Sequence, residues 1–152
     1  MTENQVGTTI IKAAIEVHRH LGPGLLETVY ESVLAHELTA RGLSVQRQVP
    51  VSFEYKGIRF DIGFRADMIV NGIVIIELKS VEAVSAAHRK QIQTYLRLTG
   101  AKLGYLLNFG AAVMKEGIVR AVSGLEEENA NSRAEALRRG EDFHSCLSTT
   151  EP

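Results

Sequence analysis

The stretch NGIVIIELKS, residues 71–80, predicts the strand at the centre of the fold and contains an unusual pair of charges. Residues 73–76 form a short apolar run, which is typical of a buried strand. Asn71-Gly72 in front of the run is a strong hairpin signal and predicts an antiparallel partner before it. Glu77 and Lys79 follow two positions apart, so they face the same side of the strand. The simplest interpretation is an exposed ion pair at the end of the strand, which contributes little stability. The alternative is that a function requires both charges.

Two segments before this stretch alternate between apolar and polar residues, as half-buried strands do. In residues 44–55 the apolar side chains fall mostly on odd positions, and in residues 58–70 they fall on even positions. Lys56-Gly57 between the segments predicts a turn. We therefore expect three successive antiparallel strands over 44–55, 58–70 and 73–81.

Helical spacing of apolar residues predicts helices on both sides of these strands. LGPG at 21–24 separates the first two helices. The remaining elements are helices over 5–20, 25–41 and 84–99, a strand over 102–109, and a short hairpin over 111–122 that turns at 115–117. This order predicts an α/β fold in which helices bracket a mainly antiparallel sheet.

The length of 152 residues suits one domain, which we expect to span 1–123. Apolar residues become sparse from Gly124 on, so 124–152 is interpreted as a polar appendage, helical and then frayed. No apolar run approaches the roughly 18 residues of a membrane helix, and the N-terminus lacks the pattern of a signal peptide. A single cysteine, Cys146, excludes an internal disulfide and a thiolate zinc site. We therefore expect a cytoplasmic protein without a membrane association.

The net charge of −1 excludes the global basic excess that is typical of dedicated duplex-binding domains. A contact with nucleic acid would have to come from a local basic patch or through metal ions.

Asp67 lies on the strand that precedes Glu77 and Lys79. Two carboxylates on neighbouring strands can share a divalent cation, because Mg²⁺ binds one or two carboxylates together with substrate phosphate. Lys79 is then placed to hold a water or to offset charge that develops on a phosphate.

Two helical segments contain further candidates. Gln91 and Tyr95 in QIQTY share one helix face, and Glu27 and Tyr30 in GLLETVY share another. Each pair also has a simpler interpretation. Tyr95 suits a core aromatic next to a boundary glutamine, and Glu27 suits a first-turn acid favoured by the helix dipole.

The ordered set Asp67, Glu77-Leu78-Lys79 and Gln91-x-x-x-Tyr95 resembles the signature of the PD-(D/E)xK nuclease superfamily. The QxxxY element is similar to that of its recombination-exonuclease branch. Residues 24–30 match the motif that names the GxxExxY family, a small single-domain group within the superfamily. The resemblance covers roughly residues 5–122 and includes AAIEVHRHLGPGLLETVYE, RQVPV, FRADMIV, IELKSV, QTYLRLTG and GYLLNF.

This resemblance implies a restriction-endonuclease-like core, a mixed β-sheet flanked by helices, with a divalent metal, Mg²⁺ or Mn²⁺, at its centre. It implies that Asp67 and Glu77 are metal ligands, that the backbone carbonyl of Leu78 adds a third, and that Glu27 assists metal binding. Ala66 stands where the superfamily has a proline before the aspartate.

The resemblance further implies that Lys79 is the catalytic lysine and that Gln91 and Tyr95 support the site. Weaker candidates for substrate contacts are Arg65, His88, Arg89 and Tyr30. The expected function is metal-dependent hydrolysis of phosphodiester bonds, in DNA more than in RNA. The alternative is a non-catalytic module that binds nucleic acid or protein on the same scaffold, and a homodimer or a protein partner is left open.

The turn at Asn71-Gly72 tests whether the two carboxylates can meet. A strict two-residue hairpin would pair Asp67 with Ile76, which faces away from Glu77. Asp67 and Glu77 would then lie on opposite sides of the sheet. We therefore expect a three-residue loop such as 70–72, with Gly72 left-handed, or a bulge in one strand.

Overall fold

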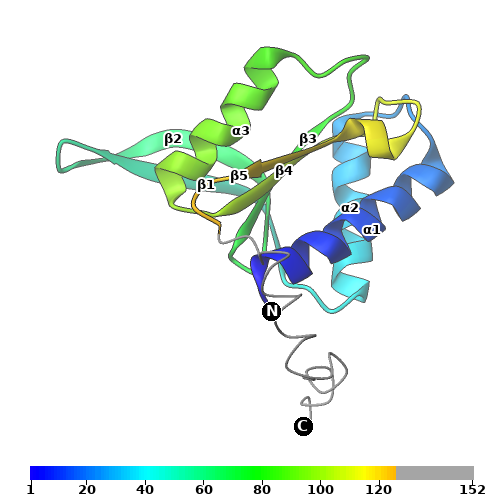
Figure 1. Cartoon of the computed structure of the whole chain (residues 1–152), viewed down its shortest axis with the longest axis horizontal. Helices are drawn as coiled ribbons and strands as arrows, with labels where there is room; N and C mark the ends of the chain where they lie inside the picture. The colour runs from blue at the N-terminus through cyan, green and yellow to red at the C-terminus, as the bar shows by residue number, and fades with distance from the viewer. Residues whose placement is uncertain (126–152) are drawn as a thin grey trace, which may run out of the picture.

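Five strands form one mixed sheet in the order β1-β2-β3-β4-β5 (Figure 1). The computed structural model describes residues 1–125, so from residue 126 on the predicted appendage lies outside the described part. All neighbouring strands are antiparallel except β3 and β4, which are parallel. The strands are β1 (Val45–Tyr55), β2 (Ile58–Val70), β3 (Val74–Lys79), β4 (Leu103–Asn108) and β5 (Ile118–Val122).

The helices begin and end where local signals place them. α1 begins with a capping box in which Thr2 and Gln5 satisfy each other's backbone N–H groups. α3 begins with the same arrangement between Ser85 and His88, and it ends at the left-handed Gly100. None of the helices in residues 1–125 is both long enough and apolar enough to cross a membrane. The helices are α1 (Glu3–Leu21), α2 (Glu27–Ala40) and α3 (Ala86–Thr99), with a 3₁₀ helix η1 (Met114–Gly117).

β3 is buried on both faces because it lies between two apolar cores. Val74, Ile76 and Leu78 belong to the larger core, which the sheet forms with α1 and α2. Ile75 belongs to the smaller core beneath α3. Figure 1 shows α3 separated from α1 and α2, which lie together. The expected fold, a mixed sheet flanked by helices, is confirmed. The burial of the apolar run is confirmed for residues 74–76, whereas Ile73 is half-buried and lies outside β3.

The hairpin predicted over 111–122 is wrong in its first half. Residues 111–113 form no strand, and residues 115–117 lie in η1 rather than in a hairpin turn. β5 pairs with β4 instead. A Cβ on Gly117 would lie 2.2 Å from the carbonyl oxygen of Asn108, so the chain returns directly against the end of β4. This close approach between distant residues is what the local sequence pattern did not predict.

The loop between β2 and β3 has three residues, as the site requires, but they are 71–73 rather than 70–72. Asn71 and Gly72 both have positive φ, +50° and +68°, and the N–H of Ile73 donates to the carbonyl of Val70 over 3.1 Å. Ile73 is the additional residue, so Val70 pairs with Val74. Because of this register, Asp67 stands opposite Glu77 rather than opposite Ile76.

Tyr30 holds the loop that joins α1 to α2. Its hydroxyl donates to the carbonyl of Gly22 and accepts the N–H of Leu25, and its ring stacks on Phe109 with centroids 4.5 Å apart. Gly24 in this loop has a φ of +103°, a conformation that favours glycine. Tyr30 is fully buried, so the prediction that it contacts a substrate is wrong.

Replacing Tyr30 with Phe should lower the free energy of unfolding by about 1 kcal/mol, because the ring stacking remains and the hydroxyl bonds to the loop are lost. Urea unfolding monitored by circular dichroism measures the change. Tyr55→Phe removes a hydroxyl from an exposed ring at the end of β1 and should change stability much less. Equal effects of the two substitutions would contradict the assigned role of Tyr30.

Candidate active site

The two strands β2 and β3 stop pairing through their backbones where the two carboxylates meet. Their ladder ends at Met68↔Ile76. Beyond it, Asp67 Oδ2 accepts the backbone N–H of Leu78 over 2.8 Å. The N–H of Asp67 in turn points to Glu77 Oε1 over 3.4 Å. The side chains therefore take over the hydrogen bonds between the strands, and the predicted proximity of Asp67 and Glu77 is observed.

The environment of Glu77 opposes its ionisation. The side chain is only 5% exposed. The pKa of Glu77 is raised from 4.5 to about 8, chiefly because burial penalises the charged form and next because Asp67 is negatively charged. The positive charge of Lys79 lowers this pKa but does not reverse the shift. In the absence of a cation, the carboxylate pair therefore retains a proton near neutral pH.

The chemistry of this donor pair fits a hard divalent cation. Asp67 Oδ2 accepts one hydrogen bond from Leu78, and each carboxylate oxygen has two lone pairs, so capacity for a cation remains. Within residues 1–125 no third His, Cys, Asp or Glu joins the pair as a ready-made metal cluster. Mg²⁺ commonly binds one or two carboxylates and completes its shell with water and phosphate oxygens, so two carboxylates meet its usual requirement.

Glu27 is not part of this pair. It is exposed at the first residue of α2 and lines a depression of about 380 Å³ with Ser80, which follows β3. The hydroxyl of Ser80 donates to the carbonyl of Leu25 over 2.7 Å and so fixes the start of α2 beside the end of β3. Glu27 is therefore at the same end of β3 as Lys79, without a hydrogen bond to Asp67 or Glu77.

Lys79 is half-buried at the last position of β3. Its carbonyl accepts the N–H of Phe109 over 2.8 Å, which holds the backbone against β4. Among the described residues, its ammonium forms no salt bridge, so the charge is available to an anion.

The predicted pairing of Gln91 and Tyr95 on one face of α3 is confirmed. Gln91 Nε2 donates to the hydroxyl oxygen of Tyr95 over 2.6 Å. The ring of Tyr95 stacks on Phe64 of β2, with centroids 3.7 Å apart and an interplanar angle of 7°. Burial first, and then the charge of Glu77, raise the pKa of Tyr95, so its phenol lies within electrostatic reach of the carboxylate pair. Tyr95 is thus both a packed aromatic and a neighbour of the site.

The predicted substrate contacts on α3 and β2 differ in their surroundings. Arg65 and Arg89 are exposed. His88 is half-buried, and its Nδ1 accepts the N–H of Ser85 over 3.2 Å in the helix cap. Because the cap engages Nδ1, only Nε2 of His88 is left for a ligand.

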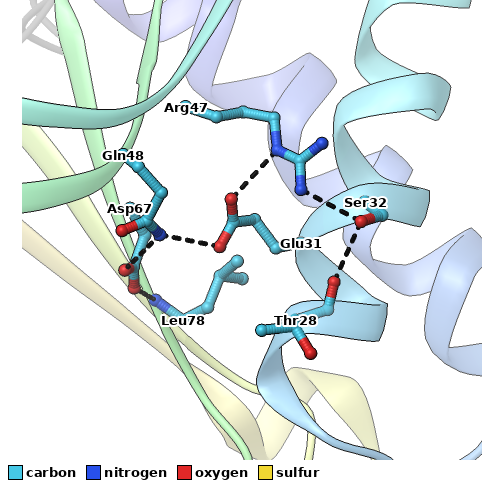
Figure 2. Close-up of polar contacts among 7 residues, drawn as sticks. All are labelled: Thr28, Glu31, Ser32, Arg47, Gln48, Asp67 and Leu78. Atoms are coloured by element: carbon cyan, nitrogen blue, oxygen red, sulfur yellow. Dashed lines mark hydrogen bonds and ion pairs between the residues drawn. The ribbon is translucent and has the colours of Figure 1, made fainter.

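A polar network beside Asp67 was missed by the sequence analysis (Figure 2). Glu31 of α2, only 6% exposed, accepts Arg47 Nε through Oε1 and Gln48 Nε2 through Oε2, both over 2.9 Å. The same Gln48 amide donates to Asp67 Oδ1 over 3.3 Å. One signal was present: Glu31 is three residues before Leu34, on the apolar stripe of its helix, where an acid has to find a partner. Gln48 carries no such signal.

The fold and the carboxylate pair together define a restriction-endonuclease-like α/β protein, with acidic side chains where two central strands diverge. The family model of the PD-(D/E)XK nuclease superfamily matches residues 4–121, and the chain belongs to this superfamily. Members are usually nucleases and typically use divalent metals such as Mg²⁺.

Comparison with solved structures gives a match to the crystal structure of SSO0001. The two chains are 18% identical, with a TM-score of 0.38, and the match covers 91% of this chain and 88% of the other. No curated protein is significantly similar in sequence.

Without divalent cations, the free energy of unfolding should fall as the pH rises from about 4.5 to about 8. In this window the folded chain keeps the Glu77 proton that the unfolded chain has lost, so each rise in pH favours the unfolded state. Glu77→Gln cannot ionise and should remove most of this slope. Urea unfolding in EDTA from about pH 4 to about pH 9 measures it.

Glu54→Gln removes an exposed carboxyl from β1 and serves as the control. It should keep the wild-type slope. Wild type and Glu77→Gln with identical slopes would show that Glu77 ionises normally.

Proposed function

We propose that this protein is a Mg²⁺- or Mn²⁺-dependent nuclease that hydrolyses phosphodiester bonds, preferentially in DNA. The observation that carries the proposal is the contact between Asp67 and Glu77 next to Lys79, at the point where β2 and β3 diverge. The buried Glu77 carboxylate beside the half-buried Asp67 carboxylate is unfavourable unless a cation joins them, and members of the superfamily typically use divalent metals.

Asp67 and Glu77 would hold the metal, with the backbone carbonyl of Leu78 as a further oxygen ligand and Glu27 assisting from the start of α2. The metal, when bound, would supply Lewis-acid polarisation of the phosphate and lower the pKa of a water.

Lys79 would offset the charge that develops on the phosphate as the oxygen of water bonds to phosphorus and the ester bond breaks. Lys79 forms no salt bridge with another residue of the described range 1–125, which supports this role. Gln91 and Tyr95 would support the site from α3, since the charge of Glu77 contributes, after burial, to the raised pKa of Tyr95.

We also propose that the chain belongs to the GxxExxY group of the superfamily. The surroundings of three residues of the motif GLLETVY, Gly24, Glu27 and Tyr30, support this assignment. Gly24 adopts the positive φ of the loop, and Tyr30 holds that loop through Gly22 and Leu25. Glu27 is left exposed next to the end of β3.

Exposed basic side chains support a nucleic-acid substrate despite the net charge of −1. Helix α3 contains no Asp or Glu, and its Arg89, Lys90 and Arg97 are exposed. Arg65 adds an exposed charge on β2. Phosphate contacts of this kind position a substrate without selecting its sequence, so we expect recognition of backbone structure rather than of bases.

Lys79→Ala should reduce phosphodiester cleavage at least ~100-fold, because it removes a charge placed at the reacting phosphate. The assay follows Mn²⁺-dependent cleavage of single-stranded, duplex and branched DNA and of RNA. Lys102→Ala removes an exposed lysine before β4 and should leave the rate unchanged. Cleavage by Lys79→Ala at the wild-type rate would refute the catalytic role of Lys79.

Calorimetric titration with Mn²⁺ distinguishes the nuclease from a non-catalytic binding module on the same scaffold. Binding that disappears in Asp67→Ala is the result expected of the nuclease. A wild-type protein that binds no Mn²⁺ or Mg²⁺ would favour the module, since the carboxylate pair would then have no cation to hold.

A further inference from the structure

We propose that Gln48 is a positioning residue that holds the carboxylate of Asp67 in the orientation needed for metal binding. This inference rests on the proposed function. Gln48 Nε2 lies 3.3 Å from Asp67 Oδ1 and 2.9 Å from Glu31 Oε2, so one amide links the site to a buried carboxylate on α2 (Figure 2).

The two contacts of Gln48 fix which end of its amide faces the site. Both partners are carboxylate oxygens, which accept hydrogen bonds when ionised, so the NH₂ group and not the carbonyl must point toward them. An NH₂ group has two hydrogens, one for each carboxylate. Gln48 is therefore matched in donor number to the two acceptors around it.

Asp67 is held from both sides of β2. Oδ1 accepts Gln48 Nε2 from β1, and Oδ2 accepts the Leu78 N–H from β3. With both oxygens engaged, the carboxylate plane is set by two neighbouring strands. The remaining lone pairs then have a defined direction, which is what a metal ligand needs, and outer partners of this kind tune metal affinity.

The opposite end of the network is anchored in α2. Arg47 donates from Nε to Glu31 and from an NH₂ group to the hydroxyl of Ser32, over 2.9 and 3.0 Å. The hydroxyl of Ser32 donates to the carbonyl of Thr28 over 3.0 Å. Arg47 thus sets the orientation of the Glu31 carboxylate, whose second oxygen accepts the Gln48 amide.

The backbone of Gln48 supports the same conclusion. Its φ is +49°, which is a left-handed conformation inside a strand. Residues other than Gly and Asn rarely adopt this conformation. The other non-glycine residues with positive φ in residues 1–125 are Lys56 and Asn71, which both lie in turns. Backbone strain of this kind persists where surrounding contacts over-determine it, and here those contacts are the two carboxylates.

Three variants test the role of Gln48. Gln48→Ala removes the amide, and Gln48→Gly removes it while also relieving the left-handed backbone. Gln46→Ala is the matched control, because Gln46 is an exposed glutamine two positions earlier on the same strand. Two measurements are made on each: Mn²⁺ affinity by calorimetry, and hydrogen exchange of the Leu78 amide by NMR in metal-free protein.

Both Gln48 variants should weaken Mn²⁺ binding about tenfold, the lower end for lost partners of a metal ligand. Their Leu78 amide should exchange about fivefold faster, because the acceptor on Asp67 is no longer held in place. Gln48→Gly relieves the backbone strain that Gln48→Ala retains, yet both variants should give the same result in both measurements. If Gln48 had only a structural role, the less strained Gly variant would differ from the Ala variant. Gln46→Ala should behave as wild type.

The proposal would be overturned if Gln48→Ala and Gln46→Ala gave the same Leu78 exchange rate and the same Mn²⁺ affinity. The exchange measurement needs neither metal nor activity. A wild-type protein that binds no Mn²⁺ would overturn the proposed function, whereas fast Leu78 exchange confined to the Gln48 variants would still establish that Gln48 positions Asp67.

Discussion

The hydrogen bond from the backbone N–H of Leu78 to the carboxylate of Asp67 is the contact on which the site depends. A buried backbone donor in a central strand has to be satisfied, and a carbonyl of the neighbouring strand ordinarily does this. Here the side chain of Asp67 does so, and β2 separates from β3 at that position. The bond requires Asp67 to stand opposite Glu77, which in turn requires the additional residue Ile73 in the loop. One residue in a turn thus determines whether the two carboxylates can bind the same cation.

The cost of this arrangement falls on a strand that is buried on both faces. Glu77 lies within a run of five buried residues, 74–78, and the other four are aliphatic. Burying each large aliphatic side chain contributes about 1.5–3 kcal/mol, so the strand can carry one unfavourable carboxyl and remain folded. The same burial that stabilises β3 raises the pKa of Glu77. Rigidity and a perturbed carboxyl group therefore have a common origin in the position of β3 between two cores.

The sequence predicted what is local and missed what depends on several elements at once. Alternation and helical spacing are local, so the strands and helices up to residue 109 were predicted correctly. The pairing of β5 depends on the approach of Gly117 to Asn108, and no local pattern encodes it. In the site, the Gln91–Tyr95 contact follows from helix geometry alone. The bridge from Glu31 to Asp67 requires α2, β1 and β2 together with a left-handed Gln48, so it emerges only in three dimensions.

In the motif GLLETVY, two residues have a structural role and one remains available to a ligand. Gly24 and Tyr30 form the loop between α1 and α2, and their roles are complete without any ligand. Glu27 has no hydrogen bond or salt bridge to another described residue, yet Ser80 fixes its helix beside the end of β3. Glu31, one turn later, is held by Arg47 and Gln48. The helix is therefore tied to the sheet on both sides of Glu27, so that an exposed carboxylate is kept at a defined place near Lys79 by its neighbours rather than by contacts of its own.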